Sequence, residues 1–388
     1  MKNVKYFTLL LVVLSGCIEP YHAQTDSINS ILVVEGIISG GTTKITLSKS
    51  VGLEIISNDF DPVNNALVYV ACDDGTRSEA AYYSGSGIYQ IATGELKTDA
   101  KYCLVIKIND TEYQSEFIPP AITQPVNVSF TCDDDDVHVY VSTQGDDHQT
   151  GFYLWSYIED WEIHSIVKGP WIYGKKDDEL ILVANDLNSS DNRYYCWGKD
   201  SSKIFILGIT ENLLDNDIHE RKIYSFPRTS DRISVLYRVR VMQNRIHREA
   251  YDYYHNMQKN NEQTGSIFAH IPSEITGNIR CVSNPDLQVI GYVDVSNTST
   301  DILYLNNEFW NPESRNIRNT LCANSVQGNP FIRQPIPFLP ALQGLGLVLF
   351  IGDPLYPESG INIAESCVDC TKMGGSKIKP KDWPNEYQ

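Results

Sequence analysis

Several features that would indicate a membrane-embedded or nucleic-acid-binding protein are missing from this sequence. Its 388 residues contain 31 Lys and Arg against 49 Asp and Glu, so the formal net charge is −18. A chain this acidic repels nucleic acid and anionic lipid, which argues against general polyanion binding. The most apolar stretch after the N-terminus, Leu345 to Ile351, is far shorter than the roughly 20 residues of a membrane-spanning helix. We therefore expect no nucleic-acid partner and no transmembrane helix.

Patterns that carry catalysis or bind metal are also missing. Gly85-Ser86-Gly87 lacks the outer glycines of a nucleophile elbow, and no His-x-x-x-His pair accompanies Cys367-x-x-Cys370. That cysteine pair favours structural disulfides, with a metal site or a redox pair as alternatives. Asp133 to Asp136 favours a solvated turn over a calcium loop, because consecutive side chains point in opposite directions. We expect a protein that is not an enzyme, with no catalytic residues, cofactor or metal.

The first residues have the pattern of an export signal that ends at a lipid-modified cysteine. Lys2 and Lys5 precede an apolar run from Phe7 to Leu14, followed by Ser15-Gly16-Cys17. Small residues before a cysteine resemble the cleavage site of the lipoprotein signal peptidase, and the Cys17 thiol would carry the lipid. Acyl chains on Cys17 would anchor the protein without a transmembrane helix, at about 0.8 kcal/mol per buried methylene.

The predicted lipid anchor indicates where the protein is located in the cell. Residues 1–16 would be the signal peptide and residues 17–30 a lipidated tether, since they are polar and aperiodic. No aspartate follows Cys17, so we expect the outer membrane, with the cell surface favoured over the periplasmic face. Asp26-Ser27-Ile28 resembles a bacterial O-glycosylation signal, which makes Ser27 a candidate.

The composition favours strands over helices. The chain holds 23 Tyr, 12 Phe and 6 Trp but only 4 Met. From Ile31 to about residue 121, short apolar runs alternate with turn signals such as Asp73-Asp74-Gly75, and Pro119-Pro120 ends the pattern. We predict a mainly β protein whose residues 31–121 form an immunoglobulin-like or transthyretin-like β-sandwich.

Residues 122–388 predict a larger β-rich domain with one substantial helix. Strands are expected at 126–130, 137–142, 152–158, 161–167, 179–183, 203–207, 233–242, 289–295 and 345–351. The helix is expected at about 245–263, where Ile246, Ala250, Tyr253 and Met257 have helical spacing and Asn244 can cap the start.

Eight cysteines besides Cys17 are disulfide candidates, because an even set in an exported protein favours disulfides. They are Cys72, Cys103, Cys132, Cys196, Cys281, Cys322, Cys367 and Cys370. The sequence does not fix their pairing. Cys72 with Cys103 is the expected pair, as neighbours within one domain, and the alternative is that some thiols stay free and buried.

Two groups of residues are candidates for binding. Between Asp217 and Asn260 the chain is locally basic, and Arg238, Arg240, Arg245 and Arg248 would contact an acidic partner. Pairing with the protein's own acids is the alternative. Trp155, Trp161, Trp171 and Tyr173 would line a carbohydrate- or peptide-binding face, or else pack in the core of a large β domain.

Local patterns along most of the chain resemble one family, the Bacteroidota outer-membrane lipoproteins classed as domain of unknown function 4249. The segments that carry the resemblance are Leu32–Gly36, Tyr195–Trp197, Glu249–Tyr254, Gly265–Phe268, Pro272–Ile279, Gly291-Tyr292, Cys367–Thr371, Gly374-Gly375, Lys379-Pro380 and Trp383. Cys132, Cys281 and Asp133 to Asp136 depart from the pattern. The resemblance implies an accessory lipoprotein that partners a TonB-dependent transporter.

The sequence therefore predicts a non-enzymatic accessory or substrate-capturing partner of a TonB-dependent barrel, attached to the membrane through Cys17. The alternative is a structural subunit of a larger outer-membrane assembly or secretion complex. A concave aromatic pocket would favour capture, and a flat face would favour assembly.

Overall fold

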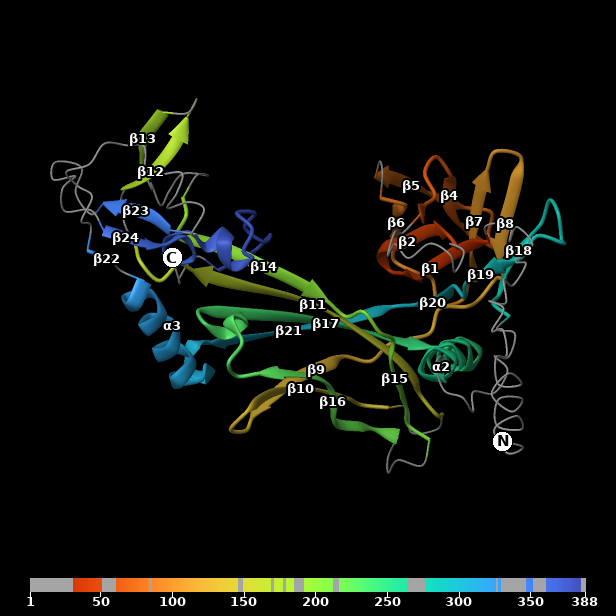
Figure 1. Ribbon diagram of the computed structural model, residues 1–388. Coiled ribbons are helices and arrows are strands. Elements are labelled where there is room, and N and C mark those ends of the chain that lie inside the picture. The colour runs from red at the N-terminus through yellow and green to blue at the C-terminus, as the bar shows by residue number, and fades with distance from the viewer. Residues whose placement is uncertain are drawn as a thin grey trace, which may run out of the picture.

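The computed structural model describes residues 31–50, 61–83, 86–145, 149–168, 171–176, 179–184, 192–211, 216–263, 276–325, 327–328, 347–351 and 361–384. The predicted signal peptide, the tether, Cys17 and Ser27 lie outside these residues. The described part is mainly β, as predicted, and contains several sheets. Figure 1 shows a long central sheet with an N-terminal sheet near one end and a small C-terminal sheet near the other.

The N-terminal sheet collects eleven of the described strands. Along its path these are β18 (Ile279–Cys281), β8 (Thr111–Ser115), β7 (Tyr102–Ile108), β4 (Leu67–Cys72), β5 (Arg77–Tyr83), β6 (Ile88–Gly94), β2 (Gly41–Lys49), β1 (Leu32–Ser39) and β19 (Val289–Ile290), with β3 (Asp61–Pro62) on β2 and β20 (Asp294–Ser296) on β1. The end strands β18 and β19 contact each other, so the sheet curls around its core. That core is built from alternating aliphatic residues such as Ile45, Leu47 and Ile91.

Three strands of this sheet come from residues 279–296, far from the others in sequence. β19 and β20 pair in parallel with β1, and β18 pairs with β8. The chain therefore leaves the N-terminal sheet after Pro120 and returns to it at Asn278. The chain leaves the sheet again after Ser296, so three crossings join the N-terminal sheet to the rest of the molecule.

The central part is a sandwich of two sheets. One contains β14 (Tyr195–Ser201), β11 (Phe152–His164), β17 (Leu236–Ile246) and β21 (Thr298–Asn306), with β15 (Ile206–Ile209) on β11. The other contains β16 (Ile218–Pro227), β10 (Asp136–Thr143) and β9 (Val126–Cys132). Their facing sides bury Val137, Val139 and Val141 against Trp155 and Tyr237. We call the four-strand path with β15 the central sheet.

The C-terminal part adds a small sheet and short helices. The sheet orders β13 (Glu179–Ala184), β12 (Trp171–Lys176), β23 (Leu347–Ile351), β24 (Ile361–Ala364) and β22 (Gln327–Gly328). The helices are α3 (Pro312–Ser325), α5 (Glu365–Val368) and the 3₁₀ turns η3 (Asn307–Phe309) and η6 (Cys370–Met373), while the 3₁₀ turn η2 (Asp231–Ile233) lies in the central part between β16 and β17. Among the described residues, no helix is both long and apolar enough to span a membrane.

The predicted long helix is α2 (Arg248–Gln263). Its start differs from the prediction, because β17 continues to Ile246 and Asn244 donates from its side-chain amide to Thr298 Oγ1 instead of capping the helix. The buried face is the predicted one, since Ala250, Tyr253 and Met257 pack into the core of the N-terminal sheet. The helix thus attaches that sheet to the end of β17.

One glycine makes the return of the chain to β1 possible. Gly291 has φ +152°, and a Cβ atom there would lie 2.4 Å from the Val34 carbonyl oxygen. We expect Gly291→Ala to destabilise the protein by at least about 2 kcal/mol through clash and backbone strain. Urea unfolding measures the effect. Gly75→Ala is the control, because Gly75 also has positive φ but open space around it. Equal losses for the two variants would contradict the close-contact account.

Candidate functional site

The central sheet depends on two unusually long strands. Phe152–Trp161 of β11 pairs with Tyr237–Ile246 of β17 in one antiparallel register, and β21 continues the register on the other edge of β17. The sequence predicted two strands, 152–158 and 161–167, where the structure has the single strand β11. Glu159 and Asp160 did not mark a turn, because both are buried and paired with arginines.

One side of this sheet is covered by β9, β10 and β16, and among the described residues the middle of the other side is left uncovered. The register places Ser156, Ile158, Arg240, Met242, Thr300, Ile302 and Tyr304 on the uncovered side. We call these residues the open face. Ile302 and Tyr304 are 41% and 42% exposed. The solvent side of an antiparallel sheet normally carries polar residues, so the exposed Ile302 and Tyr304 make the open face a candidate binding surface.

The two ends of the open face meet walls, as the overall view suggests (Figure 1). At one end, a groove of about 600 Å³ lies between the central sheet and β1 and β2, with Lys44, Met242 and Thr300 among its lining residues. At the other end, a groove of about 1020 Å³ lies between β11, β14, β17 and residues 374–382. We call these the arm groove and the basic groove. Together they make the open face concave.

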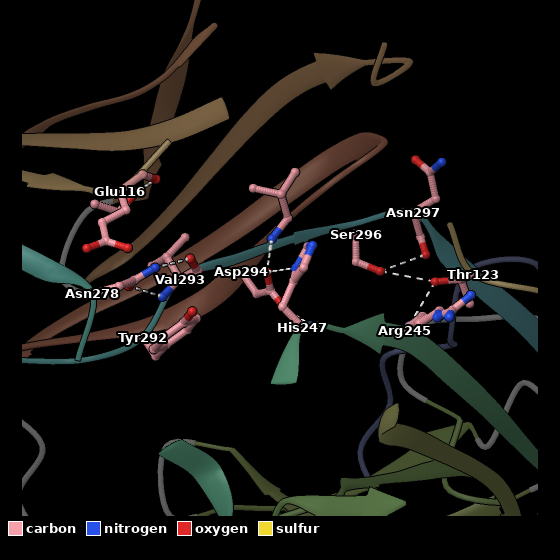
Figure 2. A network of polar contacts seen from close by, with 12 residues as sticks. Glu116, Thr123, Arg245, His247, Asn278, Tyr292, Val293, Asp294, Ser296 and Asn297 are labelled. Carbon is pink, nitrogen blue, oxygen red and sulfur yellow. Dashed lines mark hydrogen bonds and ion pairs between the residues drawn. The ribbon is translucent and has the colours of Figure 1, made fainter. Parts of the chain in front are cut away.

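A buried ionic contact helps to hold the wall of the arm groove. Figure 2 shows His247, at the turn between β17 and α2, beside Asp294 of β20. One Asp294 carboxylate oxygen lies 2.7 Å from His247 Nδ1, and the other accepts a hydrogen bond from the His247 backbone N–H at 2.8 Å. Asp294 is fully buried, and its hydrogen bond raises the pKa of His247 against the opposing effect of burial. The N-terminal sheet is thereby fixed to the central sheet by a charge-assisted contact.

Neutral hydrogen bonds extend this junction on both sides (Figure 2). Thr123 Oγ1 accepts from the Arg245 backbone N–H at 2.9 Å and lies 3.0 Å from Ser296 Oγ. Asn278 exchanges two hydrogen bonds with the backbone of Val293. Thr123, where the chain first leaves the N-terminal sheet, and Asn278, where it returns, are therefore tied to β20 or to its immediate neighbour.

The wall of the basic groove is the C-terminal segment, held by Arg238. The Arg238 guanidinium lies 2.6 Å from Asp160 Oδ2 and donates to the carbonyl oxygens of Lys381 and Asp382. It also lies over the ring of Trp383, whose indole N–H donates to Glu162 at 2.8 Å. Arg238 was predicted to contact a partner, and this is wrong because its charge is buried and neutralised by Asp160.

A disulfide and a backbone bridge complete this wall. Cys196 of β14 is bonded to Cys370, and Trp197 exchanges two 2.7 Å hydrogen bonds with Ser376. Gly375 fits here because a Cβ atom would lie 2.5 Å from Cys196 Cβ. Cys367 is bonded to Cys322, so the two cysteines of the Cys-x-x-Cys motif join different elements, and each forms a structural disulfide as favoured from the sequence.

The predicted pair Cys72–Cys103 is wrong. In the pairing of β4 with β7, Cys72 lies opposite Tyr102 and Cys103 opposite Ala71, so the two thiols point to opposite faces of the sheet. Four of the candidates, Cys72, Cys103, Cys132 and Cys281, are free thiols. Burial raises the pKa of Cys72, Cys103 and Cys132, which keeps these thiols protonated and unreactive.

The other predicted binding residues divide between core and surface. Trp155 is completely buried between the two sheets of the sandwich, and its indole N–H donates to Gln243, so it belongs to the core and not to a ligand face. Trp161 is partly buried against the same core, and the side chains of Trp171 and Tyr173 lie outside the described parts. Of the remaining arginines, Arg240 lies on the open face, and Arg245 and Arg248 lie near the junction.

Two groups that might have carried chemistry serve structural roles. Asp133 caps its own turn by accepting from two backbone N–H groups and contacts His138 at 2.8 Å; these bonds, His138 first, lower the pKa of Asp133 to about 2. His164 pairs with buried Glu162 beside a cavity of about 400 Å³, where Ser165 and Ser234 donate to backbone carbonyls. Within the described ranges, no three His, Cys, Asp or Glu side chains are placed to share a metal ion.

The fold and its disulfides define a mainly β protein with a concave sheet face. A model of the family described as "Domain of unknown function (DUF4249)" matches residues 18–302, and the chain belongs to this family. No curated protein matches it. Among solved structures, the chain is similar to chitinase ChiA74 from Bacillus thuringiensis at 9% identity, over 48% of this chain and 29% of the chitinase, with a TM-score of 0.14. A TM-score this low carries no argument.

The open face was missed by the sequence analysis, although part of its signal is present. Thr298, Thr300, Ile302 and Tyr304 alternate as strand residues should, but no strand was predicted at 298–306. The concave shape was not predictable, because both walls come from segments far from β11 and β17 in sequence.

The His247–Asp294 contact predicts a pH-dependent stability. Because Asp294 raises the pKa of His247 in the folded state, the contact contributes fully below the ordinary histidine pKa of about 6.5 and is lost as the pH rises through the raised value. We expect His247→Gln to cost roughly 1 kcal/mol at pH 5.5 and less at pH 9 in urea unfolding. His255→Gln, in which the lost ring lies beside Tyr251, is the control. A cost for His247→Gln that does not vary with pH would contradict the ionic contact.

The Cys196–Cys370 disulfide should keep the wall of the basic groove in place. We expect the double change Cys196→Ser and Cys370→Ser to speed hydrogen exchange of the Trp197 and Ser376 amides and to lower stability by about 2–4 kcal/mol. The matched control removes Cys322–Cys367, which should leave those two amides protected. Equal deprotection in both variants would show that the wall does not depend on this particular disulfide.

Proposed function

We propose that this protein is a lipid-anchored capture subunit at the surface of the outer membrane, which holds a substrate on its open face and partners a TonB-dependent barrel. In this proposal it binds and does not make or break covalent bonds. The observation that carries it is the exposure of Ile302 and Tyr304 on a sheet face with a groove at either end.

Three further observations support the proposal. The sequence Leu14-Ser15-Gly16-Cys17 resembles a lipoprotein cleavage site. The two disulfides fit an oxidising compartment outside the cytoplasm. The concave form of the face favours capture, because ligand-binding sites are typically concave.

The barrel would be contacted away from the open face, at Arg245 and Arg248. The Arg248 side chain is 70% exposed and lies 3.8 Å from Asp252, a weak pairing that leaves it available. Arg245 lies three residues away, at the end of β17. Arginine is enriched at protein interfaces and suits an acidic patch on a partner.

Recovery of the native complex tests this arrangement. We expect tagged protein purified from its own membranes to bring down a barrel, and Arg245→Glu with Arg248→Glu to lower that recovery at least tenfold, about 1.4 kcal/mol. The matched variant, Ile302→Glu with Tyr304→Glu, should keep the barrel, because the open face is reserved for substrate. Loss of the barrel from the open-face variant alone would contradict capture and favour a structural subunit. Failure to recover any barrel with the wild-type protein would overturn the partnership.

A further inference from the structure

The basic groove has a charge opposite to that of the whole protein. Five basic and two acidic side chains line it, in a chain with a formal net charge of −18. Arg238 and Asp160 neutralise each other, which leaves four basic side chains against Asp382. These are Lys199, Arg240, Lys379 and Lys381. The groove therefore favours an anionic occupant.

Three of these cations keep their charge available. Within the described part of the chain, no carboxylate forms an ion pair with Lys199, Arg240 or Lys381. Lys199 is exposed on β14, and Arg240 is half-buried on β17, opposite Ile158. A partly desolvated guanidinium binds a carboxylate more strongly than a surface lysine does. Arg240 is accordingly the main anchor for a negative group.

The groove also offers apolar contacts. Ile158, Trp197 and Ile378 line it, and Ile378 is 80% exposed. The occupant should combine carbonyl or carboxylate oxygens with apolar groups.

The edge of β14 shows how an extended chain would fit. Trp197 directs its backbone N–H and C=O away from β11, because both bond to Ser376. Antiparallel ladders alternate with a period of two, so Lys199 directs its backbone groups to the same edge. Lys199 lies in the groove, just past the position where Ser376 is bound. An extended peptide placed there would add a short strand to the central sheet.

We infer that the basic groove binds an extended acidic peptide segment, whose carboxylates pair with Arg240, Lys199 and Lys381 and whose backbone adds to the edge of β14 at Lys199. The inference rests on the proposed function, because it names the class of molecule that the protein captures. Alternate residues of such a peptide would face the groove, so its acidic and aliphatic side chains would alternate.

Fluorescence anisotropy with full-length lipidated protein in detergent tests the inference. The probe is a labelled, N-acetylated and C-amidated hexapeptide of alternating Glu and Val, compared with the same peptide carrying Gln in place of Glu. We expect the Glu peptide to bind at least tenfold more tightly, and we expect its binding to weaken when salt is raised from 50 to 500 mM. Equal binding of the two peptides, or no binding of either, would overturn the inference.

Matched variants locate the site. Arg240→Gln should weaken binding of the Glu peptide at least tenfold. Lys222→Gln should not, because it removes an exposed cation from β16, which lies on the opposite side of the central sheet. Circular dichroism and Tm verify that Arg240→Gln folds; should it not, Lys199→Gln with Lys381→Gln replaces it. An unchanged affinity in the folded variant would exclude this groove.

Two further arms test the partner class and the strand addition. A labelled oligogalacturonate that binds more tightly than the Glu peptide would overturn the peptide assignment in favour of an acidic sugar. N-methylation of alternate peptide bonds should weaken binding at least tenfold, and equal affinity would overturn addition to β14. Because purified protein is used, these outcomes are independent of barrel recovery, so either proposal can fail alone.

Discussion

The pairing of β11 with β17 is the constraint on which the other parts of the molecule depend. The two strands are 13 and 11 residues long, and the stretch that they share runs from the junction at His247 to the wall at Arg238. Since their side chains alternate, one unbroken register sends Trp155 and Tyr237 into the core and Arg240 and Met242 to the open face. A slip of one residue would exchange the two sets.

Both walls of the open face are fixed by contacts that resist small movements. On the N-terminal side, buried Asp294 accepts hydrogen bonds from two groups of His247. On the C-terminal side, Arg238 and the Cys196–Cys370 disulfide hold the segment that forms the wall. Several of these contacts are charge-assisted or covalent, and together they give a surface that is formed before any ligand arrives. Preformed surfaces lose less entropy on binding.

Local patterns in the sequence were sufficient for the strand class, for α2 and for the family, because strand alternation and helical spacing are local properties. Non-local pairing was not accessible: the disulfides join residues 174 and 45 positions apart, and β18, β19 and β20 return to a sheet that begins at Leu32. The helix α3 was missed although Asn311 caps it and Pro312 starts it, because its sequence is mostly polar and only Ile317 and Leu321 supply large aliphatic side chains. The open face was missed because only the register shows that Arg240 and Ile302 are neighbours.

Photo-crosslinking in living cells tests most directly whether the open face is a binding surface. A photoreactive phenylalanine analogue at position 304 would replace an aromatic ring of similar size. The same analogue at position 222, on β16, would probe the opposite surface of the sandwich. The account predicts an adduct of higher mass from position 304 and none from position 222. No adduct at position 304, or equal adducts at both positions, would contradict it.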